Sequence, residues 1–114
     1  MDIYGIPNCN TVKKARAWLE QHGIAYQFHD FKKTGVTAAQ LSAWAQQTGW
    51  EKLLNRQGTT WRQLSDDTKA AVTTPAAAFA LMAEKTSVIK RPVLIHNGQI
   101  LVGFDEAAYT AALK

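Results

Sequence analysis

Near its C-terminus the chain carries Asn97-Gly98 between two short apolar runs, and this feature restricts the local fold more than any other. The first run is Val93-Leu94-Ile95, and the second extends from Ile100 to Val102. Asn-Gly favours two-residue hairpin turns because both central residues need a positive φ. The pattern therefore predicts an antiparallel hairpin, followed by a last helix that Asp105 caps.

The N-terminal part predicts a different strand pairing. Asp2 to Tyr4 forms a short strand, and turn residues crowd the segment from Gly5 to Asn10. A helix is expected from about Thr11 to His22 and a second strand from Ile24 to His29. A helix that joins two strands favours a right-handed βαβ unit with parallel strands.

The middle of the chain is predicted to be helical. Thr37-Ala-Ala-Gln40 is a capping-box pattern, and Thr74-Pro75 is typical of a helix start. The element order is therefore βαβ, helices, hairpin and helix. We expect an α/β, thioredoxin-like fold with a four-stranded mixed sheet, in a single domain of residues 1–114 with a helical insert at about 37–88.

Composition narrows the class of protein. The chain has 114 residues, 46% of them apolar, and a net charge of +4, which suits one compact domain. No apolar run reaches the roughly 18 residues of a membrane span, and no secretory signal is visible. One cysteine excludes an internal disulfide and multi-cysteine zinc sites, and the three histidines lack metal-ligand spacing. We expect a cytoplasmic monomer without a metal, a membrane or a nucleic-acid partner.

Cys9 lies between the first strand and the first helix, where unpaired N–H groups favour a thiolate. A helix terminus supplies about 0.3–1 kcal/mol, at most about 2 kcal/mol, so strong activation needs a further donor. Arg91 and Arg56 are the candidates. The alternatives are a buried, inert Cys9 and a surface ion pair of Arg91 with Glu84 or Asp105.

Val12 stands where a redox dithiol would carry its second cysteine. Without that cysteine, an external thiol must resolve a mixed disulfide, and glutathione is the obvious candidate. We therefore expect no bound cofactor, glutathione as co-substrate and a small or protein disulfide as substrate, with glutaredoxin as a further partner.

Three segments resemble the ArsC/Spx family of arsenate reductases and Spx-type regulators, and most of all its single-cysteine YffB-type thiol reductases. They are Tyr4 to Arg16, Gly49 to Arg62 and Ile89 to Leu94. The resemblance implies a reductase in which Cys9 is the nucleophile, Arg91 binds an oxyanion or carboxylate, and Pro92 is a cis-proline. The remaining candidates for binding substrate or glutathione are Asn10, Thr11, Lys13 and Arg56.

The chain also departs from the arsenate reductases of that family. Gly5 stands at the place of a histidine, Asn55 at the place of one arginine, with Arg56 one residue later, and Gly103 at the place of another arginine. A tetrahedral oxyanion favours several forked donors, so glutathione- and glutaredoxin-coupled arsenate reduction is the alternative activity. An Spx-like regulator that binds RNA polymerase is the alternative from another class, although Val12 removes the dithiol switch.

Overall fold

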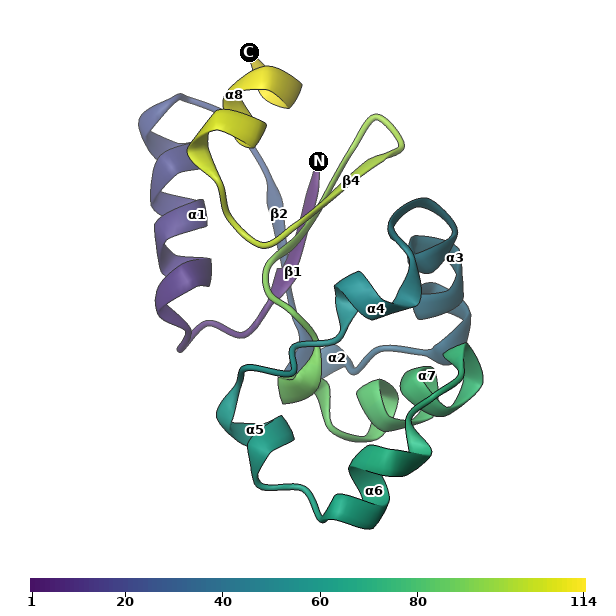
Figure 1. Ribbon diagram of the computed structural model, residues 1–114. Coiled ribbons are helices and arrows are strands. Elements are labelled where there is room, and N and C mark those ends of the chain that lie inside the picture. The colour runs from purple at the N-terminus through teal and green to yellow at the C-terminus, as the bar shows by residue number, and fades with distance from the viewer. The chain divides into compact units, whose positions relative to one another are not determined.

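The computed structural model describes residues 1–114, which divide into two compact units, Met1–Thr34 with Arg91–Lys114, and Gly35–Lys90 (Figure 1). The first unit holds β1 (Asp2–Gly5), α1 (Asn10–Gln21), β2 (Gln27–Asp30), α2 (Phe31–Thr34), β3 (Val93–His96), β4 (Gln99–Val102) and α8 (Glu106–Leu113). The second holds α3 (Ala38–Thr48), α4 (Trp50–Leu53), α5 (Thr59–Arg62), α6 (Asp66–Ala71), α7 (Pro75–Glu84) and the 3₁₀ turn η1 (Thr86–Val88). None of these helices combines the length and the apolar character that a membrane-spanning helix needs.

The first unit is built on a four-stranded sheet in the order β2-β1-β3-β4. β1 and β2 are parallel, whereas the β1–β3 and β3–β4 pairs are antiparallel. Asn97 and Gly98 turn the chain between β3 and β4 with φ values of 50° and 80°. This is the mixed sheet of a thioredoxin-like fold, and it confirms the predicted βαβ unit and Asn-Gly hairpin.

One face of this sheet carries the core of the first unit. Ile3 pairs with Phe28 and Leu94, and Leu94 pairs with Leu101, so one apolar row crosses all four strands. Helices α1 and α8 cover this row in Figure 1. Their side chains in the cluster are Ala15, Trp18, Leu19, Tyr109 and Leu113. The packing holds the start of α1 beside the end of β1.

Capping residues fix the helix starts of the second unit. The Thr37 hydroxyl accepts from the N–H of Gln40, and the Gln40 amide oxygen accepts from the N–H of Thr37. The Thr74 hydroxyl accepts from the N–H of Ala77, with Pro75 in the first turn. Both helix starts follow the sequence prediction.

Two features of the structure differ from the sequence prediction. Helix α2 is not among the elements expected from the sequence; it forms after β2, where Asp30 accepts from the N–H of Lys32 and Phe31 is buried. The strand expected from Ile24 begins at Gln27, because Ile24 donates back to the carbonyl of Leu19 and extends the helix end.

Candidate functional site

Cys9 is the N-cap of α1, at the point where the chain leaves β1 and enters the helix. Its backbone is extended, and its carbonyl accepts the first helical hydrogen bond, from Lys13, at 2.9 Å. The side chain is half-buried, so Cys9 is not a fully buried apolar residue, and its reactivity stays a prediction. The thiol therefore lies beside the unpaired N–H groups of the first turn and remains accessible to a substrate.

The surroundings of Cys9 favour the thiolate. Burial alone raises the pKa of the thiol, but the N–H of Val12, the hydrogen bond and charge of Arg91, and the N–H of Thr11 together lower that pKa below its ordinary value. The Cys9 side chain does not make a regular N-cap hydrogen bond, so these two N–H groups favour the thiolate through their partial positive charge. A helix N-terminus and a guanidinium are the two kinds of group that activate cysteines.

Arg91 and Pro92 reach Cys9 because β3 pairs with β1. Tyr4 faces Val93 in this ladder, so the segment before β3 lies beside the loop that follows β1. The Arg91–Pro92 peptide bond is cis, as the resemblance implied, and Pro92 is buried. Arg91 is half-buried, and its guanidinium lies close enough to Cys9 to lower the pKa of the thiol. Arg91 is thus a neighbour of the thiol.

The other predicted residues of this end of α1 lie in its first turn. Asn10, Thr11 and Lys13 are exposed, and Thr11 contributes its N–H to the thiolate. Exposed polar groups of this kind can contact a bound substrate without further rearrangement.

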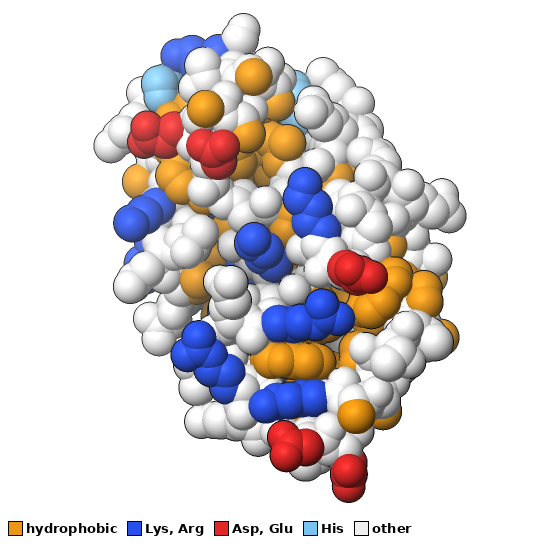
Figure 2. Space-filling view, in the orientation of Figure 1, with side chains coloured by type: hydrophobic (Ala, Val, Ile, Leu, Met, Phe, Trp, Pro, Cys, Tyr) orange, Lys and Arg blue, Asp and Glu red, His pale blue; other side chains and the backbone are white.

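Arg56 belongs to the second unit, so a role beside Cys9 stays a prediction. Its guanidinium carbon lies 5.8 Å from the ring centre of Trp50 and 5.8 Å from that of Trp61. Around α5 and α6, Figure 2 shows blue cationic side chains next to orange hydrophobic surface. Both tryptophans are partly buried, whereas Trp18 and Trp44 are buried.

Comparison with known proteins decides the family. The profile described as "ArsC family" matches residues 4–112. The chain belongs to the ArsC family. The YffB (PA3664) protein is 48% identical in its solved structure, with a TM-score of 0.94 over 99% of this chain and 98% of that chain.

Two further relatives have informative names. The structure of an arsenate reductase (ArsC) related protein from Brucella melitensis is 50% identical, with a TM-score of 0.76 over 99% of this chain and 93% of that chain. The global transcriptional regulator Spx of Streptococcus agalactiae is 26% identical over 109 residues, which are 94% of this chain and 78% of Spx. These similarities support a reductase-like enzyme with the arsenate-reductase-like fold of the ArsC family.

Gly5 and Val12 are in close contact in this ArsC-family chain. A Cβ atom at Gly5 would lie 2.8 Å from Cγ2 of Val12, closer than real Cβ contacts. Val12 is fully buried on α1. Gly5 and Val12 therefore fit each other, and a histidine at residue 5 would displace the helix or Val12. Gly103 has a φ of 80°, which disfavours an arginine there.

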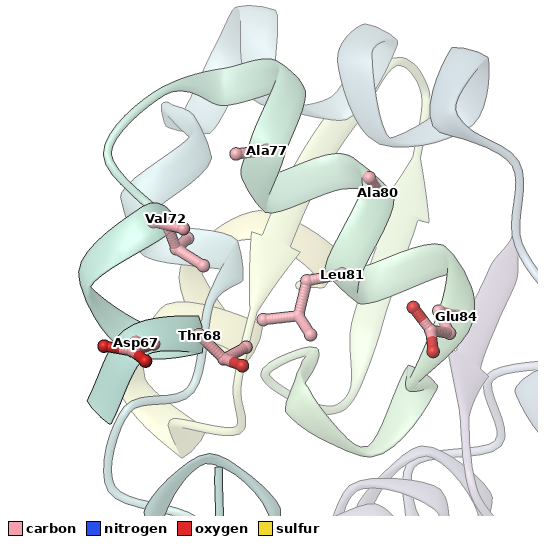
Figure 3. A pocket seen from close by; sticks show the side chains of 8 residues that line it. Asp67, Thr68, Val72, Ala77, Ala80, Leu81 and Glu84 are labelled. Atoms are coloured by element: carbon pink, nitrogen blue, oxygen red, sulfur yellow. The ribbon is translucent and has the colours of Figure 1, made fainter. Parts of the chain in front are cut away.

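Each unit of this ArsC-family protein also contains a surface cavity. One lies in the first unit between α1, β2 and α2, with Pro7 in its wall. The other lies between α6 and α7, where the side chains of Thr68, Val72 and Leu81 point toward one another and Asp67 and Glu84 stand at the rim (Figure 3). No group of His, Cys, Asp and Glu side chains comes together as a set of metal ligands.

Proposed function

We propose that this protein is a glutathione-dependent thiol–disulfide reductase that uses Cys9 as its only nucleophile. The observation that carries the proposal is a half-buried thiol at a helix N-terminus, with a pKa lowered by backbone N–H groups and Arg91. The chain has one cysteine, so a mixed disulfide on Cys9 must be resolved by another molecule.

The reaction is two thiol–disulfide exchanges. The Cys9 thiolate attacks one sulfur of a disulfide RSSR′, forms Cys9–S–S–R and releases R′S⁻, which takes a proton from water. A glutathione thiolate then attacks the R sulfur, so that Cys9 leaves as a thiolate and the disulfide GSSR is released. The net reaction is RSSR′ + GSH → R′SH + GSSR, and the product is GSSG when R is itself glutathionyl.

The residues near the thiol have separate roles in this scheme. Arg91 stabilises the Cys9 thiolate both as the attacking group and as the leaving group. The N–H groups of the first helical turn act in the same direction. Asn10, Thr11, Lys13 and Pro92 would contact the disulfide substrate or glutathione, and Arg56 would add a cation. Glutaredoxin is a further candidate partner, and the reducing cytoplasm is the compartment where this chemistry can operate.

The test is steady-state turnover of a glutathionylated peptide with glutathione, glutathione reductase and NADPH. The wild type is expected to consume NADPH in proportion to enzyme and glutathione concentration. Cys9→Ser is expected to reduce the rate to that of the uncatalysed exchange, because the hydroxyl cannot form the mixed disulfide. Full turnover by Cys9→Ser, with circular dichroism showing an intact fold, would remove Cys9 from the mechanism.

Arsenate reduction is the second candidate, because the Brucella melitensis relative is described as arsenate reductase related. Against it, residue 5 has no room for the histidine, and the backbone of Gly103 disfavours the arginine of arsenate reductases. Arsenate-dependent NADPH oxidation with glutathione, glutaredoxin and glutathione reductase would establish this activity. No turnover with all components present would remove it.

A regulatory role is the third candidate, because Spx is similar over most of its length. It predicts binding to RNA polymerase that survives Cys9→Ala, since Val12 leaves no dithiol to sense oxidation. No complex between the purified protein and RNA polymerase at micromolar concentration would count against it.

A further inference from the structure

A cavity of about 440 Å³ lies in the same unit as Cys9 but uses none of the residues assigned to the thiol site. Its walls come from α1, from all four residues of β2 and from α2, with Pro7 completing the rim. Volumes of this size are typical of small-ligand sites. The charged groups that line it are Arg16, Asp30 and Lys33, and the His29 imidazole lies beside them.

Arg16 is held in place before any ligand binds. Its guanidinium carbon lies 4.2 Å from the ring centre of Phe28, and Nε donates to the Tyr26 hydroxyl at 3.0 Å. That hydroxyl in turn donates to a carboxylate oxygen of Glu20 at 2.8 Å. Because Nε is engaged, the two terminal NH₂ groups of Arg16 are the donors left for a ligand. A guanidinium fixed in this way is suited to bidentate binding of a carboxylate.

The opposite wall adds charges of both signs. Lys33 lies on α2 with an exposed side chain. Asp30 ends β2, and one of its carboxylate oxygens accepts from the N–H of Lys32 at 2.9 Å. His29 is bound to Asp2 at 2.8 Å and is thereby oriented within the unit. Two cations and one carboxylate around a small cavity match a ligand that carries both a carboxylate and an ammonium group.

The cavity also runs along an open sheet edge. β2 is the first strand in the order β2-β1-β3-β4 and has a strand neighbour on one side only. Alternate backbone N–H and C=O groups of an edge strand can bind the backbone of an extended peptide. A short peptide with a free amino-acid end could therefore bind the charged side chains with its carboxylate and ammonium groups, and the open edge of β2 with its backbone.

The cavity is within reach of the reactive sulfur. Pro7 lies two positions before Cys9, a separation that spans at most about 7 Å. Arg16 follows Cys9 by seven positions, so both lie on one side of α1. Seven helical residues rise about 10 Å along α1, which is about the length of an extended tripeptide.

We propose that this cavity binds the γ-glutamyl end of glutathione, with the α-carboxylate on Arg16 and Lys33, the ammonium group on Asp30 and the peptide backbone along β2. This inference rests on the proposed function, because it gives the co-substrate of that reaction its place. Glutathione would be positioned with its cysteine toward Cys9.

Binding is measured with S-methylglutathione, which cannot form a disulfide, by isothermal titration calorimetry on the wild-type chain. Lys33→Gln is expected to weaken binding about threefold to fivefold, as for a solvent-exposed charge pair. Arg16→Gln is expected to weaken it at least about tenfold, because two charge-assisted hydrogen bonds are lost. Lys32→Gln is the matched control: the same charge is removed one residue away, outside the cavity, and binding should stay within about twofold.

The ligand side has its own control. S-methylated Cys-Gly lacks the γ-glutamyl group and is expected to bind the wild type at least about tenfold more weakly, with no further loss in Lys33→Gln. The iodoacetamide reactivity of Cys9 should be the same in wild type, Lys32→Gln and Lys33→Gln, because none of these changes touches the thiol.

Three results would overturn the cavity assignment. They are equal binding by Lys32→Gln and Lys33→Gln, equal binding of the two ligands, and no binding of S-methylglutathione at millimolar concentration. If glutathione-dependent turnover persists in any of these cases, the proposed reductase function stands and only the cavity is refuted. If turnover with glutathione is also absent, the proposed function fails with it.

Discussion

Arg91 is the side chain whose removal should change the reactivity of Cys9 most clearly. Arg91→Gln removes a charge and a hydrogen bond that lower the pKa of the thiol. A hydrogen bond to a charged group contributes about 1.5–3 kcal/mol when sheltered. Cys9 is half-exposed, so solvent screening reduces the effect to about 1 kcal/mol, or about fivefold in the thiolate equilibrium.

The rate of alkylation responds less than the equilibrium does. A thiolate with a higher pKa is intrinsically more nucleophilic, with a Brønsted slope of about 0.4–0.5. The thiolate of Arg91→Gln should therefore have a rate constant about twofold higher than that of the wild-type thiolate, which offsets part of the fivefold loss. Below the thiol pKa of both proteins, Arg91→Gln should therefore react with iodoacetamide about 2.5-fold more slowly. Above both pKa values it should react about twofold faster, so the two pH–rate profiles cross.

The control is Lys90→Gln, which removes the same charge one residue earlier from an exposed side chain. Its profile should superimpose on that of the wild type. The reasoning is refuted if Arg91→Gln leaves the profile unchanged, or if Lys90→Gln shifts it as much as Arg91→Gln does. In either case the guanidinium would have no specific effect on the thiolate.

Four further predictions concern stability, each read from urea unfolding. Gly5→Ala should lower the free energy of unfolding by about 1–3 kcal/mol, because the new Cβ would lie 2.8 Å from Val12. In a Val12→Ala background, Gly5→Ala should cost much less, so a double variant whose loss equals the sum of the two single losses would contradict the contact. Tyr109→Phe should leave stability unchanged or raise it by up to about 1 kcal/mol, because the buried Tyr109 hydroxyl has no protein partner and burial raises its pKa. A loss above about 1 kcal/mol would mean that this hydroxyl has a hydrogen-bond partner. Thr37→Ala should cost about 1 kcal/mol through its capping box, and no loss would mean that α3 is held by packing alone. The difference in stability between wild type and Cys9→Ala has a pH-dependent part, which should be largest above the ordinary thiol pKa of about 8.5 and should be lost as the pH falls through the lowered native pKa. The opposite trend would mean that the fold raises this pKa.

Local sequence signals predicted the elements whose ends depend on neighbouring residues. Asn97-Gly98, the Thr37 capping box and the Thr74-Pro75 helix start all act within a few residues, and all three are present. The β1–α1–β2 unit was predictable because a helix between two short strands has one favoured hand. The order of the four strands was not predicted, because it depends on the pairing of β3 with β1.

Features that depend on side-chain burial were harder to predict. Helix α2 was missed because Phe31, between Asp30 and two lysines, gives no periodic pattern in four residues. Trp50 and Trp61 are only partly buried, and both rings lie near the guanidinium of Arg56. A large aromatic side chain can make a cation–π contact instead of packing fully in the core, and the sequence alone does not distinguish the two.

The candidate site was predictable in part. The position of Cys9 before a helix followed from turn residues, whereas the approach of Arg91 depends on the pairing of β3 with β1. The cavity beside Pro7 had no sequence signal, because Arg16, Asp30 and Lys33 come from three separate elements. Spacing along the chain does not reveal such groups, and only the sheet brings them together.

The most direct test of the central claim is rapid-quench mass spectrometry of the wild-type protein mixed with a glutathionylated peptide and then with glutathione. We predict that a mixed disulfide appears on Cys9 first, and that added glutathione removes it at a rate no slower than steady-state turnover. Turnover without this adduct, or an adduct that glutathione removes more slowly than turnover, would contradict catalysis through a Cys9 mixed disulfide.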